Sequence, residues 1–241
     1  ETTIAWSAGG FPAVILDDTS INPGAPAKPG AVELVNRSGR ERTFIVEDRA
    51  WVRDALTADR ITTLQAFRDL FSDEALRPGD DVAVGSVTLM FTDLRGSTAL
   101  YREMGDAGAF HLVRAHFAFL AETVRAHDGA VVKTIGDAVM AAFTKPADAV
   151  AAALAVQRKV AAFNREHAKR GENDGIVIKL GLHLGPCIAV TLNGRIDYFG
   201  GTVNMAARLQ GQSKGGDIVL SEDVAADPEA IKLVAPLNPA M

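Results

Sequence analysis

The stretch VTLMFTDLRGSTALY, residues 87–101, places an apolar run directly before an aspartate and a turn of small residues. The run VTLMF shows no clear alternation of apolar and polar residues, so we expect a buried strand covered on both faces. Asp93 follows this run, where a carboxylate is costly unless it is paired, hydrogen-bonded or bound to a metal ion. Gly96, Ser97 and Thr98 come next, before a helical segment. Asp93 is therefore either the N-cap of that helix or a ligand.

The overall composition is that of a globular chain with one large domain or two small ones: 241 residues, 48% hydrophobic and 23% charged. The net charge of −5 gives no indication of nucleic-acid binding. No apolar run approaches the ~18 residues of a membrane span, and the single Cys187 excludes an internal disulfide framework. We therefore expect a cytoplasmic chain without a nucleic-acid partner or a membrane span. Because it starts with Glu1 rather than methionine, we expect it to be part of a longer protein.

The chain is expected to divide near residue 84. Residues 1–84 contain a linker-like segment, INPGAPAKPG, then a hairpin signal around RSGR and a helical region at 50–72 with Thr57 as candidate N-cap. From residue 85 to 241, strand and helix signals alternate, so an α/β sheet layer covered by helices is the economical fold. The expected elements are a strand at 86–92, helices within 96–127, two strands within 129–143, a helix at 146–169, a strand, break and strand within 176–193, a helix from Thr202 and a strand at GDIVLS.

A second carboxylate, Asp137, lies at the Gly-Asp turn within GAVVKTIGDAVMAAF, residues 129–143. A turn aspartate alone is unremarkable. Two carboxylates at strand ends, however, can converge at one edge of a sheet. Mg²⁺ is commonly held by one or two carboxylates together with substrate phosphates, and the N–H groups of a helix N-terminus bind phosphate oxygens. Asp93, Asp137 and the turn after Asp93 therefore predict a site for metal ions and phosphates.

A third cluster is IDYFGGTVNMAARLQ, residues 196–210. Asn204 and Arg208 are four residues apart on the helix expected here, so they share one face, and Asp197 precedes the glycine turn. Taken singly, each has an ordinary interpretation: Arg208 as a solvated surface arginine and Asn204 as a polar helix residue. Lys133, within VVKTIG, would equally be a strand-end lysine.

The three motifs FTDLRGST, VVKTIGDAVMAAF and DYFGGTVNMAARL together resemble the catalytic domain of the class III nucleotidyl cyclases, the adenylate and guanylate cyclases. The resemblance covers roughly residues 86–222, and three motifs in this order are highly specific. It implies a ferredoxin-like, palm-like sheet covered by helices. Residues 35–76 are similar, less specifically, to an accessory module that precedes the cyclase domain in some bacterial members.

The resemblance implies metal binding by the carboxylates of Asp93 and Asp137 and by the backbone carbonyl of Leu94. These ligands would hold two divalent cations, Mg²⁺ or Mn²⁺. The turn that contacts the phosphates in the family corresponds to Gly96, Ser97 and Thr98.

The residues that read the base in the family correspond to Lys133 and Asp197, a combination that goes with adenine. The chemistry agrees, because adenine N1 is an acceptor that a lysine can serve and its N6 amino group is a donor that an aspartate can accept. Asn204 and Arg208 correspond to the catalytic residues that orient the ribose and stabilise charge on the reacting phosphate.

The resemblance therefore implies an adenylate cyclase, which converts ATP to 3′,5′-cyclic AMP and pyrophosphate by in-line attack of the ribose 3′-hydroxyl at a two-metal site. Sites in the family are shared between two chains, so a chain holding both halves is expected to form a homodimer. Two alternatives stay open: a cyclase-like domain that binds nucleotide and regulates a partner without turnover, and a cyclase for GTP or a pyrimidine nucleotide. The family's late phosphate-binding lysine has no match after Arg208, so we expect the catalytic domain, 85–241, to be truncated at its C-terminus.

Overall fold

The computed structural model describes residues 12–26, 32–43, 56–71, 79–167 and 175–237. The chain divides into two compact units, Glu1–Ala55 and Leu56–Met241, and each has its own sheet. Among the described helices, none combines the length and the apolar character needed to cross a membrane.

The first unit contains a three-stranded sheet with the order β2-β1-β3. β1 (Pro12–Leu16) pairs antiparallel with β2 (Ile21–Pro26) and parallel with β3 (Leu34–Asn36). The interpretation of INPGAPAKPG as a linker is therefore wrong for its first six residues, which form β2. Their prolines are tolerated because β2 is an edge strand. Of the hairpin predicted around RSGR, the first run contains β3, and most of the second run lies outside the described residues.

Two short helices, α1 (Ala58–Thr62) and α2 (Gln65–Phe71), open the second unit. The single helical region predicted over 50–72 is interrupted between them, and its first six residues lie outside the described part of the chain. Thr57 occupies the predicted N-cap position, but its side chain makes no capping hydrogen bond in the described structure. Both helices pack on the sheet of the larger unit, whereas the sequence placed them in a module ending at residue 84.

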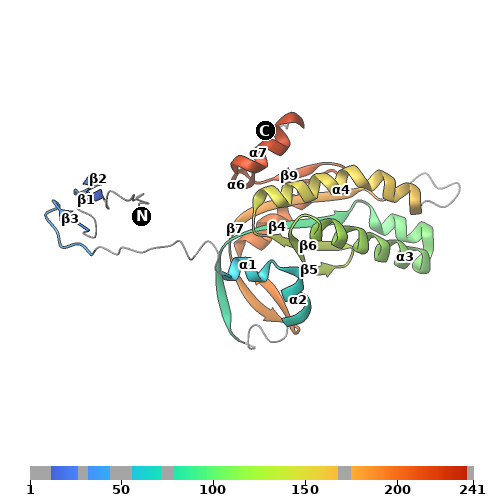
Figure 1. The fold of residues 1–241 in the computed structure, drawn as a ribbon. Coiled ribbons are helices and arrows are strands. Elements are labelled where there is room, and N and C mark those ends of the chain that lie inside the picture. Colours follow the sequence, from blue (N-terminus) through green and yellow to red (C-terminus); the bar gives the residue numbers. More distant parts are fainter. Residues whose placement is uncertain (1–11, 27–31, 44–55, 72–78, 168–174, 238–241) are drawn as a thin grey trace. The chain divides into compact units, whose positions relative to one another are not determined.

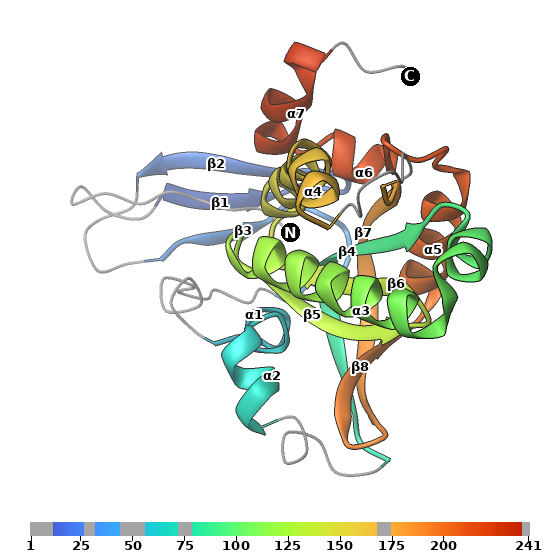
Figure 2. The same cartoon turned by 90° about the vertical axis from the view of Figure 1, so that its right-hand side faces the viewer.

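The second unit is built on a six-stranded sheet, with β5-β6-β4-β7-β8 in order and β9 paired with β7 outside this path. Neighbouring strands are antiparallel except for β9, which is parallel to β7. The two strands predicted within 129–143, joined at a Gly-Asp turn, are confirmed as β5 and β6 (Figures 1 and 2). The strand bounds are β4 (Asp81–Leu94), β5 (Gly129–Ile135), β6 (Ala138–Phe143), β7 (Ile178–Leu192), β8 (Arg195–Phe199) and β9 (Ile218–Leu220).

β7 is one continuous strand of 15 residues, so the predicted break within 176–193 is wrong. Pro186 stands in its middle and has no N–H to donate to the ladder. It is accommodated because β4 bulges opposite it. The pairs Val84–Cys187 and Val87–Gly185 leave two residues of β4 facing Pro186 alone.

Helices cover both faces of this sheet. One core lies under α3, α4, α6 and α7, and the other lies under α1, α2 and α5. β4 contributes to both, with Met90 in the first core and Leu89 and Phe91 in the second, so the prediction of a strand covered on both faces is confirmed. The helix bounds are α3 (Ser97–Arg125, kinked at Gly105), α4 (Pro146–His167), α5 (Gly201–Gln212), α6 (Glu222–Ala225), α7 (Pro228–Val234) and the 3-10 helix η2 (Ala235–Leu237).

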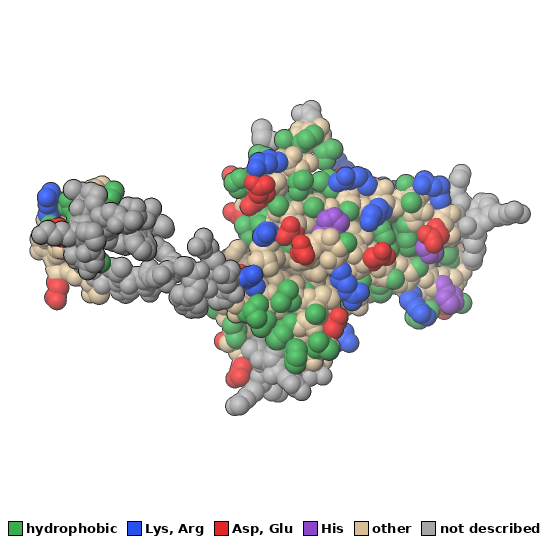
Figure 3. Space-filling model, viewed as in Figure 1, with side chains coloured by type: hydrophobic (Ala, Val, Ile, Leu, Met, Phe, Trp, Pro, Cys, Tyr) green, Lys and Arg blue, Asp and Glu red, His purple; other side chains and the backbone are tan. Residues whose placement is uncertain are grey.

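The outer surface of the α1–α2 pair is partly apolar. Figure 3 shows hydrophobic side chains gathered over these helices, and Leu64, Leu70 and Phe71 are all exposed. Their inner surface supplies Phe67 and Ala58 to the second core.

The expected α/β arrangement, a sheet covered by helices, is confirmed for the second unit.

Candidate active site

The two predicted aspartates lie at one edge of the sheet. Asp93 is the penultimate residue of β4, and Asp137 lies in the turn between β5 and β6. Between β4 and β6, Thr92 pairs with Val139, and the Thr92 hydroxyl accepts a hydrogen bond from the Val139 N–H at 3.2 Å. Because the two strands are antiparallel, the end of β4 meets the start of β6. The structure thus brings the two carboxylates to neighbouring positions.

The two carboxylates influence each other electrostatically. Burial raises the pKa of Asp93, and the negative charge of Asp137 adds to this effect, while Lys179, the Leu94 N–H and Gln210 act in the opposite direction. The Oδ2 atom of Asp137 is buried and has no hydrogen-bond partner among the described residues. Adjacent carboxylates disfavour one another's ionisation unless a cation compensates their charge. The pair therefore fits a divalent cation.

The turn behind Asp93 opens α3. Its N-cap is Gly96, whose φ of 71° lies in the left-handed region that glycine adopts without strain. Asp93 is thus not the cap, and that alternative interpretation is wrong. Ser97 and Thr98 form the start of the first turn, where backbone N–H groups have no intrahelical acceptor. The turn is therefore suited to an anion.

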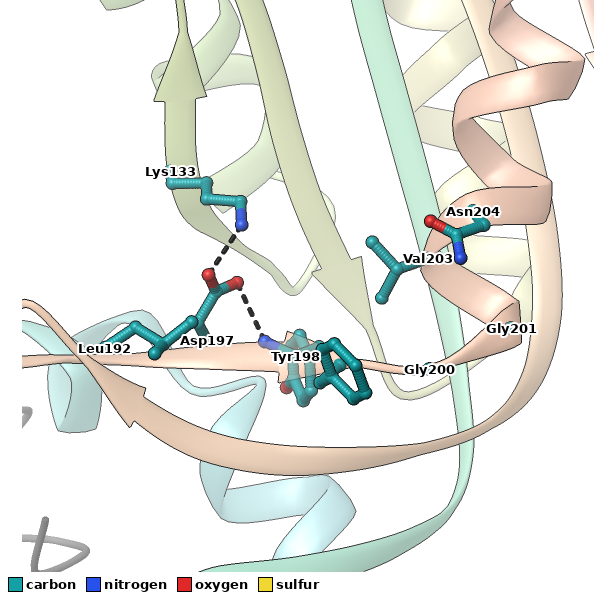
Figure 4. A pocket seen from close by; sticks show the side chains of 9 residues that line it. Lys133, Leu192, Asp197, Tyr198, Gly200, Gly201, Val203 and Asn204 are labelled. Carbon is teal, nitrogen blue, oxygen red and sulfur yellow. Dashed lines mark hydrogen bonds and ion pairs between the residues drawn. The ribbon is translucent and has the colours of Figure 1, made fainter. Parts of the chain in front are cut away.

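A pocket of about 340 Å³ lies between β5, β8 and the start of α5. Lys133 enters it from β5 and Asp197 from β8, and the Lys133 Nζ and Asp197 Oδ2 atoms are 2.5 Å apart (Figure 4). The side chain of Asp197 is 9% exposed and that of Lys133 is 36% exposed. The other Asp197 carboxylate oxygen accepts a hydrogen bond from the Tyr198 N–H at 2.8 Å. Two strands therefore bring together the predicted base-reading residues, which are 64 positions apart.

The α5 helix carries the last two predicted residues. Asn204 lines the same pocket, and Arg208 lies one turn further along the same exposed face. Arg208 is not among the described residues that line this pocket. α5 can approach β7 closely because Gly181 has no side chain. A Cβ atom on Gly181 would lie 2.1 Å from the Gln210 backbone nitrogen. This close packing fixes the helix that carries Asn204 and Arg208.

Three further side chains surround the aspartates, and the sequence did not predict them. The Tyr101 hydroxyl is buried without a hydrogen-bond partner among the described residues; burial and the charges of Asp137 and Asp93 raise its pKa to about 12. Burial lowers the pKa of His116 to about 4, against the opposing effect of Asp137. The Gln210 Nε2 atom lies 3.5 Å from Asp93 Oδ2. Helical spacing after the turn could have indicated Tyr101, whereas the other two come from distant parts of the chain.

Comparison with known proteins agrees with this geometry. The Adenylate and Guanylate cyclase catalytic domain family matches residues 81–229, more than half of the chain. An adenylate cyclase of Mycosarcoma maydis is 34% identical over an alignment of 157 residues, and the alignment covers 58% of this chain and 6% of that protein. Adenylate cyclase 1 of Rhizobium meliloti is 31% identical over an alignment of 167 residues, which covers 64% of this chain and 25% of that protein. The chain therefore spans only a minor part of the length of these relatives.

Solved structures share the fold of the second unit. The adenylyl cyclase CyaB from P. aeruginosa has a TM-score of 0.57 at 22% identity, covering 66% of this chain and 84% of that chain. The guanylate cyclase domain of RhGC from Catenaria anguillulae, in complex with GTP, has a TM-score of 0.54 at 23% identity, covering 64% and 84%. These likenesses confirm the palm-like sheet covered by helices. On its motifs, its fold and the match over residues 81–229, the chain belongs to the family of adenylate and guanylate cyclase catalytic domains.

Proposed function

We propose that this chain is an adenylate cyclase that converts ATP to 3′,5′-cyclic AMP and pyrophosphate. The observation that carries the proposal is the Lys133–Asp197 pair in the pocket, with Nζ and Oδ2 2.5 Å apart. Adenine offers an acceptor at N1 and a donor at N6, which a lysine and a carboxylate can serve together. Guanine presents the reverse pattern, so the pair favours adenine. The adenylate cyclases among the relatives support the same base.

Asp93, Asp137 and the backbone carbonyl of Leu94 are proposed to hold two divalent cations, Mg²⁺ or Mn²⁺. The buried Oδ2 atom of Asp137, for which the described residues offer no hydrogen-bond partner, supports this role. Among the described residues, no three His, Cys, Asp or Glu side chains are placed to hold one metal ion together, so backbone and substrate oxygens would complete the ligand set. When bound, the cations supply positive charge to the reacting phosphate and the 3′-hydroxyl.

The remaining polar groups are proposed to position the substrate. The first-turn N–H groups of α3, from Gly96 to Thr98, bind phosphate oxygens. Asn204 orients the ribose so that its 3′-hydroxyl is in line with the α-phosphorus. Arg208 stabilises the negative charge that develops on that phosphate.

The site is proposed to be shared between two copies of the chain. Large apolar side chains at the ends of β5, β7 and β8, around the pocket, are exposed: Ile135 is 50%, Leu192 50% and Phe199 67% exposed. Exposed apolar groups around a polar pocket are typical of a surface that a partner covers. In a homodimer, a second copy would bring Asp93 and Asp137 to this pocket, and symmetry would create two sites.

Incubating the chain separately with ATP, GTP, CTP and UTP in the presence of Mn²⁺, and separating the products by chromatography, tests the proposal. Cyclic AMP and pyrophosphate are the expected products, formed from ATP. Another cyclic nucleotide would overturn the adenine assignment. A folded, dimeric chain that forms none would favour the alternative of a nucleotide-binding regulatory domain.

Asp106→Ala, which removes an exposed carboxylate of α3, is the matched control for Asp137→Ala in the same assay.

A further inference from the structure

Helices α1 and α2 precede the segment that matches the cyclase family, residues 81–229, yet they bind the strand that carries Lys133. The Gln65 Oε1 atom of α2 accepts a hydrogen bond from the Val131 N–H of β5 at 2.7 Å, two residues before Lys133. The Thr63 and Thr144 hydroxyls lie 2.7 Å apart and add a second polar contact, to the residue that directly follows β6. Figures 1 and 2 both show the helix pair beside β5.

The same helix pair binds the strand that carries Asp197. Arg68 of α2 donates from Nη2 to the Ile196 carbonyl of β8 at 2.5 Å, directly before Asp197. Its Nη1 atom donates to the Thr62 carbonyl of α1 at 2.6 Å. The guanidinium also lies 5.4 Å from the centre of the Tyr198 ring, directly after Asp197. One side chain therefore joins α1 to the β8 residues on both sides of Asp197.

The burial of Arg68 indicates more than ordinary packing. Arg68 is only 6% exposed, and a buried guanidinium is unfavourable unless its donors are satisfied. An apolar side chain of similar length would pack against the sheet without the free-energy cost of removing a charged group from water. What a guanidinium adds is a rigid planar fork between two backbone carbonyls. It also places a positive charge that interacts favourably with Asp197.

We propose that Arg68 is a positioning residue for base recognition. It fixes β8 so that the Asp197 carboxylate faces the pocket, and Gln65 fixes β5 so that Lys133 meets it there. The inference rests on the proposed base-reading role of that pocket. A helix pair with a packing role alone would affect stability and leave base selection unchanged.

The test compares Arg68→Met with Arg125→Met in the full chain. Arg125 also faces α2, with its Nη2 atom 3.9 Å from Asp69 Oδ2, but its side chain is 54% exposed. The affinities for ATP and GTP are measured by competition with a fluorescent ATP analogue. kcat and KM are measured for the triphosphate that the wild type converts. Amide hydrogen exchange is followed in residues 195–199 and in α4.

Arg68→Met is expected to raise the Kd and KM for the preferred nucleotide roughly tenfold and to reduce the ATP:GTP selectivity by a similar factor, with a smaller change in kcat. Exchange in residues 195–199 should accelerate more than exchange in α4, because the anchor of β8 is lost. Arg68→Lys, which keeps a positive donor, should recover part of the selectivity. Arg125→Met should match the wild type.

Selectivity of folded Arg68→Met equal to that of Arg125→Met would overturn the proposal. If Arg68→Met does not fold, the ATP:GTP selectivities of Gln65→Leu and Arg68→Lys are compared with that of Arg125→Met instead. Equal selectivity in all three variants would overturn the proposal. A wild type that binds nucleotide but forms no cyclic product would overturn the proposed function alone, because competition binding needs no turnover. A wild type that binds neither nucleotide would overturn both.

Discussion

Reversing the donor and acceptor pattern of the pocket should move nucleotide preference from ATP toward GTP. The change is Lys133→Glu combined with Asp197→Cys. Both are needed because their charged atoms are 2.5 Å apart and the Asp197 side chain is only 9% exposed. Lys133→Glu alone would set a second carboxylate against a buried one. Asp197→Cys alone would leave the ammonium of Lys133 without its partner.

The size of the effect follows from the two hydrogen bonds that the pair can make to the base. Each involves a charged group of the protein and contributes about 1.5–3 kcal/mol. Losing both with ATP corresponds to about 3–6 kcal/mol, or roughly 10²–10⁴-fold in kcat/KM. The low exposure of Asp197 favours the upper part of this range, because a buried polar group left unpaired by the wrong base is not compensated by water.

The measurement is kcat/KM for ATP and for GTP with Mn²⁺, for the wild type and the double variant. Lys232→Glu is the control, since it reverses the charge of an exposed lysine that pairs with Glu229 at 2.6 Å in α7. The ATP:GTP ratio should fall in the double variant and stay constant in the control. An unchanged ratio in a folded, dimeric double variant would refute the claim that Lys133 and Asp197 read the base.

Further predictions concern the metals, the shared site and the pH dependence of stability. Asp93→Ala or Asp137→Ala should lower turnover at least roughly 100-fold while thermal unfolding stays near that of the wild type; activity above about a tenth of wild type in both would contradict metal binding. Equal mixing of Asp93→Ala and Arg208→Ala chains should restore up to about a quarter of the activity, because mixed dimers keep one intact site; verified subunit exchange without activity would argue against the shared site. Burial alone would raise the pKa of Asp217, but hydrogen bonds from the 213–215 turn lower it, so its stabilisation is present above the unfolded pKa and lost as pH falls through the folded one. Asp217→Asn should therefore reduce the free energy of unfolding by about 1 kcal/mol at neutral pH, a small value because the carboxylate is partly exposed, and by less in acid; a difference independent of pH in urea titrations would rule this out.

Local sequence patterns predicted much of the sheet and the two aspartates as candidate metal ligands. VTLMF had to be buried on both faces, and β4 contributes to both cores. A Gly-Asp turn between two apolar runs predicted β5 and β6. Antiparallel pairing of β4 and β6 then brings Asp93 and Asp137 to neighbouring positions. The strands and the candidate ligands needed nothing beyond strand length, turn chemistry and the cost of burying a charge, whereas the pairing of β4 with β6 came from the structure.

Elsewhere local signals conflicted with tertiary context. The pattern of residues 176–193 predicted a break, but a bulge in β4 opposite Pro186 lets β7 continue. The prolines of residues 21–26 suggested a linker, but the edge of the first sheet accepts them. In both places a partner strand decides the conformation, and its register cannot be read from the segment itself.

The sequence by itself determined the strand that ends at Asp93, the glycine turn behind it, and which residue types could bind metal, phosphate and base. Only the tertiary structure decided that Lys133 and Asp197 meet in one pocket, and that Arg68 reaches β8 from a helix outside the family match. The physical reason is the range of the interactions. Turns, caps and strand burial depend on a few neighbouring residues, whereas contacts over 64 and 128 positions exist only after the sheet and its helices have packed.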